Sequence, residues 1–303
     1  MVLSKRSSEQ ALFKHELKPV SLHDVYTALH ALAISKNDIL LVHSDIGLFG
    51  LPAASKEIVL GSIIHALKDA VGEKGMVIMP TFTYSFERDE VFDIQHSRSR
   101  VGALTEYFRT QKDVARTKQP QHSVALWPAN EETLKVGKDS FDDHSIFAKL
   151  YNLKGKILFF GVSFTKSCTF VHFPEYKHTV PYRYFRTYKG MVKDGNKQYA
   201  DVATSTVKYR YFVTNLTSLE NHLKNKGLLK EAPLGMGTIG VIDARALYDE
   251  CLRVLDEDIY FYLKNDGFFK VFNACMYPVI KHMPWLARFL EITFSLIWYR
   301  KMP

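Results

Sequence analysis

An early alternation of strand-like and helix-like segments constrains the fold more than any other feature of the chain. Residues 38–43 form a β-prone apolar run that leads into Ser44–Gly50, a turn with two glycines. Residues 57–71 place apolar side chains at helical spacing, and Met76–Met79 is a second β-prone run. Strand, helix and strand in this order form a parallel βαβ unit, whose ligands bind beyond the carboxyl ends of the strands. We therefore expect residues 44–50 and 80–83 to face one crevice.

The rest of the chain mixes further helices and strands, without internal repeats. Ser21 precedes an apolar helical pattern and is a predicted N-cap. Asp194–Asn196 separates two β-prone segments and predicts a hairpin across residues 189–208. Other helices are expected at residues 21–35, 102–109, 141–151, 215–225 and 244–262, and other strands at 157–162 and 235–242.

The composition favours a folded, cytoplasmic protein. With 303 residues, of which 47% are hydrophobic, the chain can bury a large core as one α/β domain or as two smaller ones. Cys168, Cys251 and Cys275 are widely spaced, so neither a disulfide framework nor a zinc site is predicted. The first residues lack the apolar segment of a signal peptide, and no uncharged apolar run reaches the roughly 18 residues of a membrane span.

Positive charge is concentrated in two stretches of a chain whose net charge is +8. Residues 177–210 hold eight basic and two acidic side chains, and residues 267–303 hold five and one. The remainder of the chain is therefore close to neutral. Charge localised in this way favours an anionic partner, which would be a phosphorylated ligand, a membrane surface or nucleic acid.

The stretch Lys156–Tyr176 carries the residues with the clearest catalytic potential. An apolar run as far as Val162 is followed by hydroxyl and thiol side chains and then by His172 and Glu175. An apolar run that turns polar indicates a buried strand that delivers a loop. A histidine with a carboxylate three residues on suits general base catalysis. The alternative is a surface histidine beside a solvated acid.

Five motifs in register connect the chain to a known family. They are Val42–Gly47, Gly75–Thr83, Phe92–Asp93 with Val101–Arg109, Arg116–Val124, and Thr169–His172 with Glu175. On these motifs the chain resembles the aminoglycoside 3-N-acetyltransferase family, which transfers acetyl from acetyl-coenzyme A (acetyl-CoA) to an amine. The resemblance covers residues 38–176 and weakens through residue 263. It implies an α/β fold with a central mixed β-sheet flanked by helices and a CoA cleft, to which we add the predicted β-hairpin insertion and a C-terminal helical extension.

The transfer reaction defines what the site must contain. An ammonium attacks a thioester only after it loses a proton, and a neutral imidazole can accept that proton at pH 7. The resemblance places His172 as this base and Glu175 as the carboxylate that orients it. Thr169 matches the family's threonine before the histidine and is the expected donor to the thioester oxygen or sulfur. Direct transfer from acetyl-CoA, or from another short acyl-CoA, needs no metal and no covalent intermediate.

The candidate binding residues form two groups, one for the acyl-CoA and one for the acceptor. His43 and Ser44 end the first predicted strand, and the alternative to ligand binding there is a role in forming the turn. For His122 the alternative is capping of a strand. The expected acyl-CoA contacts are His43, Ser44, Asp45, Ile46, Gly47, Thr81 and Ser123. The expected acceptor contacts are His122, Tyr84, Tyr182, Arg183 and Arg186.

Two departures from the family pattern lie near the acceptor or the thioester. Gln119 replaces the usual histidine before Pro120, and Cys168 replaces the usual asparagine before Thr169. Both changes leave the predicted base intact and point away from an antibiotic as the substrate. We interpret Cys168 as a small buried thiol rather than as a nucleophile.

Charge also bears on the choice of acceptor. Aminoglycosides are polycations and need an acidic pocket, whereas Tyr182–Arg186 begins a basic block with interleaved aromatic residues. Arginine and tyrosine suit a diphosphate and a base or sugar ring, so we predict a nucleotide-linked amino sugar for surface polysaccharide, for example lipopolysaccharide, synthesis. The alternatives for the block are a solvated hairpin face or contacts to the coenzyme's own phosphates.

Two alternative functions stand beside this prediction. The first is an aminoglycoside 3-N-acetyltransferase that confers antibiotic resistance. The second, from a different class, is a non-catalytic module that binds a membrane or nucleic acid. RNA-binding signatures are missing from the sequence, so nucleic acid is not the expected partner.

Residues 267–303 are predicted to form a helical extension after an acetyltransferase-like α/β domain at residues 1–266. Aromatic residues alternate with lysines and arginines in this extension, a composition suited to an interfacial helix pair. Docking on the inner face of the membrane is one hypothesis, and packing on the core or on a second subunit of a homo-oligomer is the alternative. The aromatic residues are Phe268, Phe269, Phe272, Tyr277, Trp285, Phe289, Phe294, Trp298 and Tyr299.

Overall fold

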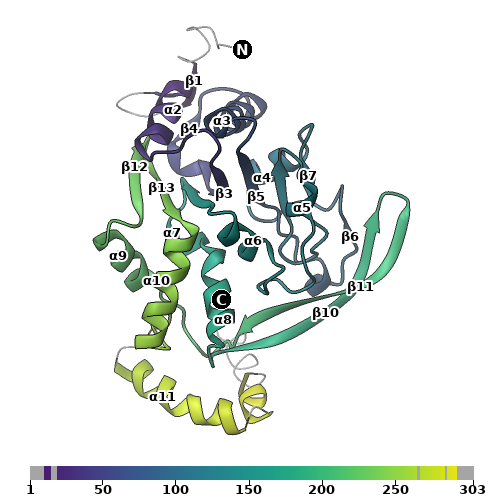
Figure 1. Ribbon diagram of the computed structural model, residues 1–303, viewed down its shortest axis with the longest axis vertical. Helices are drawn as coiled ribbons and strands as arrows, with labels where there is room; N and C mark the ends of the chain where they lie inside the picture. The colour runs from purple at the N-terminus through teal and green to yellow at the C-terminus, as the bar shows by residue number, and fades with distance from the viewer. Residues whose placement is uncertain (1–9, 15–18, 265–266, 284, 292–303) are drawn as a thin grey trace.

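A mixed seven-stranded β-sheet forms the centre of the protein (Figure 1). The structure, a computed structural model, describes residues 10–14, 19–264, 267–283 and 285–291. The strand order is β12-β13-β9-β3-β5-β8-β7, in which β3 is parallel to β5 and β9 and the other pairs are antiparallel. The predicted α/β class with a central mixed sheet is confirmed. The strands are β3 (Ile39–Ser44), β5 (Met76–Pro80), β7 (Ala115–Arg116), β8 (Val124–Trp127), β9 (Lys156–Phe160), β12 (Lys230–Leu234) and β13 (Gly237–Asp243).

Helices cover both faces of this sheet because its central strands are apolar on both sides. In β3, Leu40 and Val42 pack with one set of helices and Leu41 packs with the other, as the alternation of side chains along a strand requires. The first set is α2 (Leu22–Ala31), α3 (Lys56–Val71) and α4 (Ala103–Arg109). The second set is α6 (Ile146–Asn152), α8 (His172–His178), α9 (Thr217–Asn225) and α10 (Ala244–Glu257).

The parallel strands β3 and β5 are joined by α3, as the βαβ pattern predicts. Ser55 caps the start of α3 by accepting a hydrogen bond from the backbone of Ile58, and Gly72 ends the helix at a φ of +69°. Ser21 is the predicted N-cap of α2 and forms a capping box with Asp24. Because β3, β5 and β9 are parallel, their carboxyl ends meet at one edge of the sheet.

A long β-hairpin reaches out beside the body of the protein (Figure 1). Its strands β10 (Arg183–Asp194) and β11 (Lys197–Lys208) pair along their whole length, and β6 (Phe92–Asp93) adds a short parallel strand. The predicted turn at Asp194–Asn196 is confirmed, with Gly195 at a φ of +60°. The predicted start at residue 189 is wrong. Residues 183–187 are mostly polar and lack apolar alternation, so their pairing with β11 was not visible in the sequence.

Further elements differ from the prediction, among them the helix expected at residues 21–35, where α2 ends at Ala31. α10 ends at Glu257 because Asp258 adopts an extended backbone with a φ of −145°. The helix expected from residue 141 begins only at Ile146, after its N-cap Ser145. Strand β12 was not predicted because Pro233 and two charged residues interrupt it, and it lies at the sheet edge, where proline is tolerated. The remaining elements are β1 (Ala11–Lys14), β2 (Val20–Ser21), β4 (Leu51–Pro52), α5 (Glu131–Leu134), α7 (Phe164–Ser167), α11 (Gly267–His282) and the 3₁₀ helices Ile46–Phe49, Phe86–Arg88 and Thr169–Val171.

The C-terminal extension packs on the core along one side. Met276 of α11 and Ala287, in a helical segment at residues 285–291, are buried in the core cluster that includes α8 and α10. The other side exposes Val271 (65%) and Trp285 (69%). Within the described ranges, no helix is long and apolar enough to cross a membrane. Of the aromatic residues predicted for this extension, the side chains of Phe268 and Phe269 and all of Phe294, Trp298 and Tyr299 lie outside the described residues.

Candidate active site

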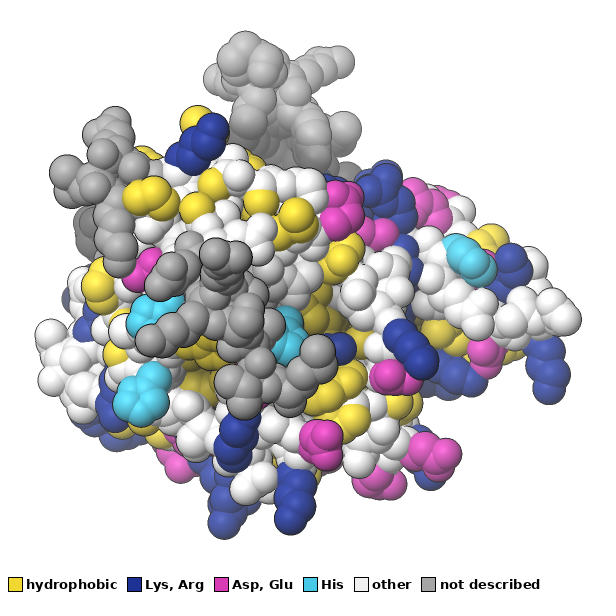
Figure 2. Space-filling view, turned by 90° about the horizontal axis from the view of Figure 1, so that it is seen from above, with side chains coloured by type: hydrophobic (Ala, Val, Ile, Leu, Met, Phe, Trp, Pro, Cys, Tyr) yellow, Lys and Arg dark blue, Asp and Glu magenta, His cyan; other side chains and the backbone are white. Residues whose placement is uncertain are grey.

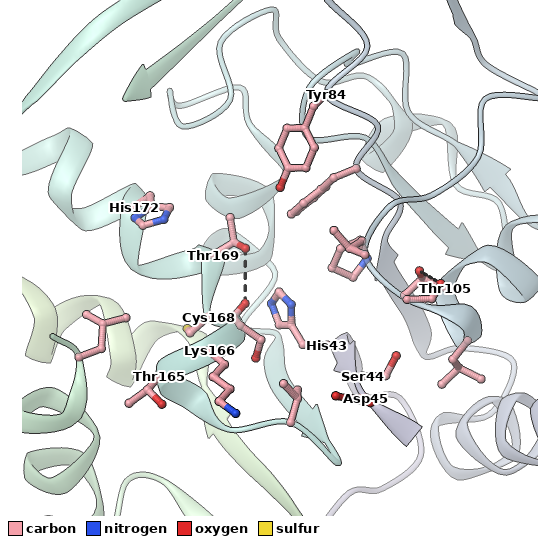
Figure 3. Close-up of a pocket in the computed structure, with 18 of the residues that line it drawn as sticks. His43, Ser44, Asp45, Tyr84, Thr105, Thr165, Lys166, Cys168, Thr169 and His172 are labelled. Atoms are coloured by element: carbon pink, nitrogen blue, oxygen red, sulfur yellow. Dashed lines mark hydrogen bonds between the residues drawn. The ribbon is translucent and has the colours of Figure 1, made fainter. Parts of the chain in front are cut away.

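A cleft of about 950 Å³ lies at the carboxyl ends of β3, β5 and β9. Its walls include residues 43–47, Pro80 and Phe82, and residues 165–169 after β9. Figure 3 shows Tyr84 and Lys166 on opposite sides of this space, with His43 and Thr169 between them. The crevice predicted to be shared by the loops after β3 and β5 is therefore present.

Glycine allows two of these loops to approach each other closely. Gly161 follows β9 with a φ of +76°, and a Cβ atom there would lie 2.4 Å from the carbonyl oxygen of Asp45. Any other residue at this position would therefore push the loop after β3 away from the loop after β9. This contact keeps residues 43–47 beside residues 162–169 in the cleft wall.

His172 and Glu175 form a pair at the start of α8, in which the imidazole is half-buried and the carboxylate is buried. The helix begins at His172, so the spacing of three residues brings both side chains to one face. His172 Nδ1 lies 2.6 Å from Glu175 Oε2. The Tyr182 hydroxyl donates to Glu175 Oε1 at 2.9 Å, and Glu175 is only 2% exposed. These contacts hold the carboxylate in one orientation against the imidazole.

Arg183, the first residue of β10, completes this cluster. Its Nε lies 2.8 Å from Glu175 Oε2, and its Nη2 lies 2.8 Å from His172 Nδ1. A guanidinium only donates hydrogen bonds and a carboxylate only accepts them, so Nδ1 can satisfy just one of these two neighbours. Pairing with the buried carboxylate is the stronger interaction. The imidazole proton therefore belongs on Nδ1, which leaves the lone pair of Nε2 available.

Burial and charge keep the imidazole neutral. Burial, followed by the charge of Arg183, lowers the pKa of His172 below its usual value, although Glu175 opposes this shift. Burial also acts to raise the pKa of Glu175, but the charge of Arg183 and the hydrogen bond from His172 hold that pKa below its usual value. At pH 7 the cluster thus contains a neutral base beside an ionised acid.

A smaller hollow of about 210 Å³ meets the cleft at His172. Both spaces share part of their lining, so a molecule in each would approach the same imidazole. The shared lining residues are Tyr84, His172, Arg183, Val207 and Lys208. The other lining residues of the hollow are Glu87, Gln121, His122, Phe141, Tyr188, Ser205 and Thr206.

Five of the seven predicted acyl-CoA residues, His43–Gly47, line the large cleft. His43 Nε2 and Ser44 Oγ are buried there, and neither has a hydrogen-bond partner among the residues that the structure describes. Burial lowers the pKa of His43 to about 4, so this ring is neutral. Orphaned polar atoms in a wide cleft fit a long polar ligand such as an acyl-CoA.

Thr81 and Ser123 lie behind the cleft and do not line it. The Ser123 hydroxyl donates to the carbonyl oxygen of Thr81 at 2.8 Å. Arg116 Nε lies 3.1 Å from the Thr81 hydroxyl and 3.2 Å from the Ser123 hydroxyl. These side chains join the loop after β5 to the start of β8, which is a structural position rather than a contact surface for a ligand.

The five predicted acceptor residues separate in the structure. Tyr84 and Arg183 line both spaces, and His122 lines the small hollow. Tyr182 is fully buried and lines neither space, because its hydroxyl is bonded to the buried carboxylate of the cluster. Arg186 is exposed on the hairpin and also lies outside both spaces. Tyr182 therefore positions another residue and does not contact a ligand.

Sequence reasoning missed two lysines on the large cleft, Lys166 and Lys208. Lys208 is the last residue of the predicted hairpin and pairs directly with Arg183 across it, so the base of the hairpin closes the site. Cys168 also lines the cleft and is buried, and this burial raises the pKa of its thiol. Among the described residues, no group of histidine, cysteine or acidic side chains is arranged to hold a metal ion.

Acids from other parts of the chain neutralise much of the basic block. Glu87 lies 3.7 Å from Arg186, and Asp93 lies 3.0 Å from Lys193. On the face displayed in Figure 2, lysine and arginine side chains are interspersed with aspartate and glutamate. The charge counted along residues 177–210 therefore overstates the positive field around the site.

A half-buried imidazole with a lowered pKa, held by a carboxylate where two spaces meet, is the arrangement expected of a general base between two bound molecules. The family model for aminoglycoside 3-N-acetyltransferases matches residues 41–256 of this chain. The chain belongs to this family and is a CoA-dependent N-acyltransferase that uses acetyl-CoA. This assignment as an enzyme replaces the alternative of a non-catalytic binding module.

Individual relatives are distant in sequence but similar in fold. Aminoglycoside N(3)-acetyltransferase IV of Salmonella is 26% identical over 236 residues, which cover 77% of this chain and 86% of the relative. The crystal structure of AAC(3)-IVa without ligand superposes with a TM-score of 0.65 at 22% identity, covering 84% of this chain and 94% of that structure. The YokD protein of Bacillus subtilis superposes with a TM-score of 0.66 at 18% identity, covering 80% and 95%.

Proposed function

We propose that this protein acetylates an amino group of an amino sugar, with acetyl-CoA in the large cleft and the acceptor in the small hollow. The single observation that carries the proposal is the position of His172 in the shared wall of the two spaces. As a neutral imidazole with Nδ1 directed at Glu175, His172 is suited to act as the general base.

Proton transfer through His172 accounts for the whole reaction. The acceptor enters as an ammonium and releases its first proton to solvent through Nε2 of His172. As the neutral amine attacks the thioester carbonyl, Nε2 takes the second proton, the N–C bond forms and the C–S bond breaks. The imidazolium, stabilised by the charge of Glu175, then gives this proton to the departing sulfur. The acyl group passes directly between the substrates.

Residues on the large cleft would hold the acyl-CoA. His43, Ser44 and the turn at residues 45–47 offer polar atoms that lack partners within the described chain or lie on the cleft wall. Among the described residues, the Thr169 hydroxyl makes only a long contact of 3.4 Å, to the carbonyl oxygen of Ser167. It can therefore reorient to donate to the thioester oxygen, where negative charge develops during attack.

The acceptor that the comparisons favour is an aminoglycoside rather than the nucleotide-linked amino sugar predicted from charge. Solved structures of AAC(3)-IVa, at 22% and 23% identity to this chain, are complexes with apramycin and with a gentamicin. The basic block that suggested a diphosphate is largely paired with acids. A nucleotide-linked amino sugar is the second candidate because Lys166 and Lys208 line the cleft.

Thiol release from acetyl-CoA, followed with gentamicin, apramycin and a nucleotide-linked amino sugar as separate acceptors, tests both parts of the proposal. We expect His172→Ala to lower kcat by about 10²- to 10⁴-fold, as for a lost general base. His178 lies on the same helix, is hydrogen-bonded to Asp256 and lines neither space, so His178→Ala should retain wild-type turnover. Near-normal turnover by His172→Ala would remove this residue from the mechanism, and acetylation of the nucleotide-linked sugar alone would reverse the choice of acceptor.

We also propose that the exposed side of the C-terminal helices docks on an anionic membrane surface. Val271, Trp285 and Phe289 are exposed on these helices, and the basic side chains of Lys270 and Arg288 are exposed near them in the sequence. If a second copy of the chain packed on this side, the positive charges of the two copies would face and repel each other. Anionic lipid headgroups would instead attract them. The cytoplasmic location and the division at residue 266 remain predictions.

Flotation with lipid vesicles separates these outcomes for the C-terminal helices. The full chain should float with vesicles that contain phosphatidylserine and not with vesicles of phosphatidylcholine alone, and Trp285→Ser should reduce the floating fraction. Protein that stays unbound to both kinds of vesicle contradicts membrane docking. A dimer in sedimentation that is lost in Trp285→Ser would assign the surface to a second copy instead.

A further inference from the structure

The small hollow contains buried polar atoms that the described part of the chain leaves unsatisfied. Gln121 is 1% exposed, yet neither its Oε1 nor its Nε2 has a hydrogen-bond partner among the described residues. The hydroxyl of Thr206, on β11, is also buried and also has no hydrogen-bond partner among the described residues. Both residues line the hollow. Because unpaired buried polar groups are costly, their presence in a native fold points to a ligand that pairs with them.

A third group in this hollow, His122, is held in one tautomer by its neighbours. Gln119 Oε1 accepts hydrogen bonds from the backbone of Gln121 at 2.6 Å and of His122 at 2.7 Å. This fixes the orientation of the Gln119 amide, whose Nε2 then donates to the Ser140 hydroxyl at 3.1 Å. The only proton of that hydroxyl is left for His122 Nδ1, which lies 2.8 Å away.

Because the described residues offer the Ser140 proton no other acceptor, this arrangement favours the His122 tautomer with its ring proton on Nε2. Burial, followed by the proximity of the His172 ring and the charge of Arg183, lowers the pKa of His122 to about 3, so the ring stays neutral. His122 thus presents a fixed neutral donor rather than a second base. The side chain at position 119 sets this state, and it is the position at which the chain departs from the histidine usual in the family.

Three residues of the hollow have buried polar atoms without a hydrogen-bond partner among the described residues: Gln121 and Thr206, which are uncharged, and Arg183, whose Nε faces Glu175 in an ion pair. Of its cations, Arg183 is paired with Glu175 and Lys208 donates to backbone carbonyl oxygens. Glu87 is the one acidic residue in the lining, and its side chain is partly exposed. Tyr84, Phe141 and Tyr188 add aromatic faces. Neutral hydrogen-bonding groups beside aromatic rings suit a hydroxyl-bearing sugar ring.

We infer that Gln121, Thr206 and His122 form a subsite that hydrogen-bonds the hydroxyl groups of the sugar ring whose amine is acetylated. The inference rests on the proposed function, since it places that ring in the small hollow. Gln121 supplies both a donor and an acceptor, Thr206 supplies a hydroxyl, and His122 supplies the Nε2–H. A site built to pair with hydroxyl groups discriminates against analogues that lack them, because its buried polar atoms then stay unpaired. These residues therefore determine acceptor specificity and leave acetyl-CoA binding unaffected.

Gln121→Met removes both polar atoms at similar size and tests the subsite. With gentamicin and with glucosamine as acceptors, kcat/KM should fall about tenfold to hundredfold, the range for lost hydrogen bonds to a buried group. The KM for acetyl-CoA should not change. The midpoint of thermal unfolding without ligand should not fall, because the substitution removes unpaired buried groups rather than a contact. Thr206→Val should act in the same direction, and Gln198→Met, at an exposed position of the same β11 strand, is the matched control.

Two measurements keep this inference separate from the proposed function. Unchanged acceptor kcat/KM in Gln121→Met, or an equal effect on the KM for acetyl-CoA, overturns the subsite while the function stands. If the wild-type protein acetylates neither amine, the proposed function fails for these acceptors. Equilibrium titration of gentamicin and glucosamine without acetyl-CoA then decides the subsite by itself: weaker binding to Gln121→Met supports it, and equal or absent binding to both proteins rejects it.

Discussion

Replacing Glu175 by glutamine should lower both the stability of the protein and its turnover, because this carboxylate is the counter-ion of Arg183 and also orients His172. The change keeps the shape of the side chain and removes its charge. In the wild-type protein that charge faces His172 at 2.6 Å and Arg183 at 2.8 Å, inside a site where Glu175 is 2% exposed. Glu175→Gln therefore leaves Arg183, whose side chain is 9% exposed, without its counter-ion.

The expected losses of unfolding free energy and of kcat follow from this geometry. Removing one partner of a buried ion pair costs about 3–5 kcal/mol, a large share of the roughly 5–15 kcal/mol that typically separates folded from unfolded protein. The amide of glutamine can also donate to Nδ1 of His172, which would move the ring proton to Nε2 and block the base. Loss of the orienting carboxylate beside a catalytic histidine lowers kcat by up to about 10⁴-fold, and we expect a loss of at least about 10²-fold.

Chemical denaturation and thiol-release kinetics measure these effects on the same samples. The double variant Glu175→Gln with Arg183→Met removes the uncompensated cation, so it should regain part of the unfolding free energy but none of the turnover. Glu250 provides the control: it is buried and bonded to His222, Lys226 and Arg253, and it lines neither space. Glu250→Gln should lower stability while the folded protein keeps its kcat. Wild-type turnover by Glu175→Gln would refute this account of the carboxylate.

Three other predictions follow from the site. Since burial and Arg183 lower the pKa of His172, kcat/KM should stay constant from pH 8 to about 6.5 and fall only as more acidic conditions protonate the base; an acid limb centred above pH 7 would contradict the neutral state. Gly161→Ala forces a Cβ atom against the Asp45 carbonyl at a φ of +76°, so the unfolding free energy should fall by more than about 1 kcal/mol and the KM for acetyl-CoA should rise; an unchanged denaturation midpoint would show that the loop adapts. Because burial raises the pKa of the Cys168 thiol, Cys168→Ala should keep its turnover and native protein should resist alkylation at this position; loss of all activity in Cys168→Ala would instead indicate an acyl-enzyme.

The parts of the fold that the sequence revealed depend on local patterns. The βαβ unit around α3 was predictable because its helix and strands are apolar, regular and punctuated by glycine, as at Gly72. The crevice then followed from strand direction alone. His172 and Glu175 were paired in advance through the family resemblance, although they were expected on a loop; they lie instead on α8, where a spacing of three residues brings side chains together.

The errors have a common physical origin in partners that lie far apart in sequence. The basic block was interpreted as a field for an anionic acceptor, but Arg186 is near Glu87 and Lys193 is paired with Asp93. Tyr182 and Arg183, which are adjacent in the sequence, were both predicted to contact the acceptor, but they have different positions in the structure. Tyr182 is bonded to the buried carboxylate, whereas Arg183 lies in the wall of both spaces.

The hairpin shows why the acceptor side could not be derived from motifs. Arg183 and Lys208 are opposed as the first pair of this hairpin, so its base, rather than its tip, forms the wall that the cleft and the hollow share. Thr206 reaches the hollow from the same strand, beside Gln121 from the loop before β8. A slip of one residue in this pairing would turn Thr206 and Lys208 to the opposite face of the strand. The register of the hairpin therefore determines which side chains meet the acceptor, and that register is specified over twelve pairs that no single motif contains.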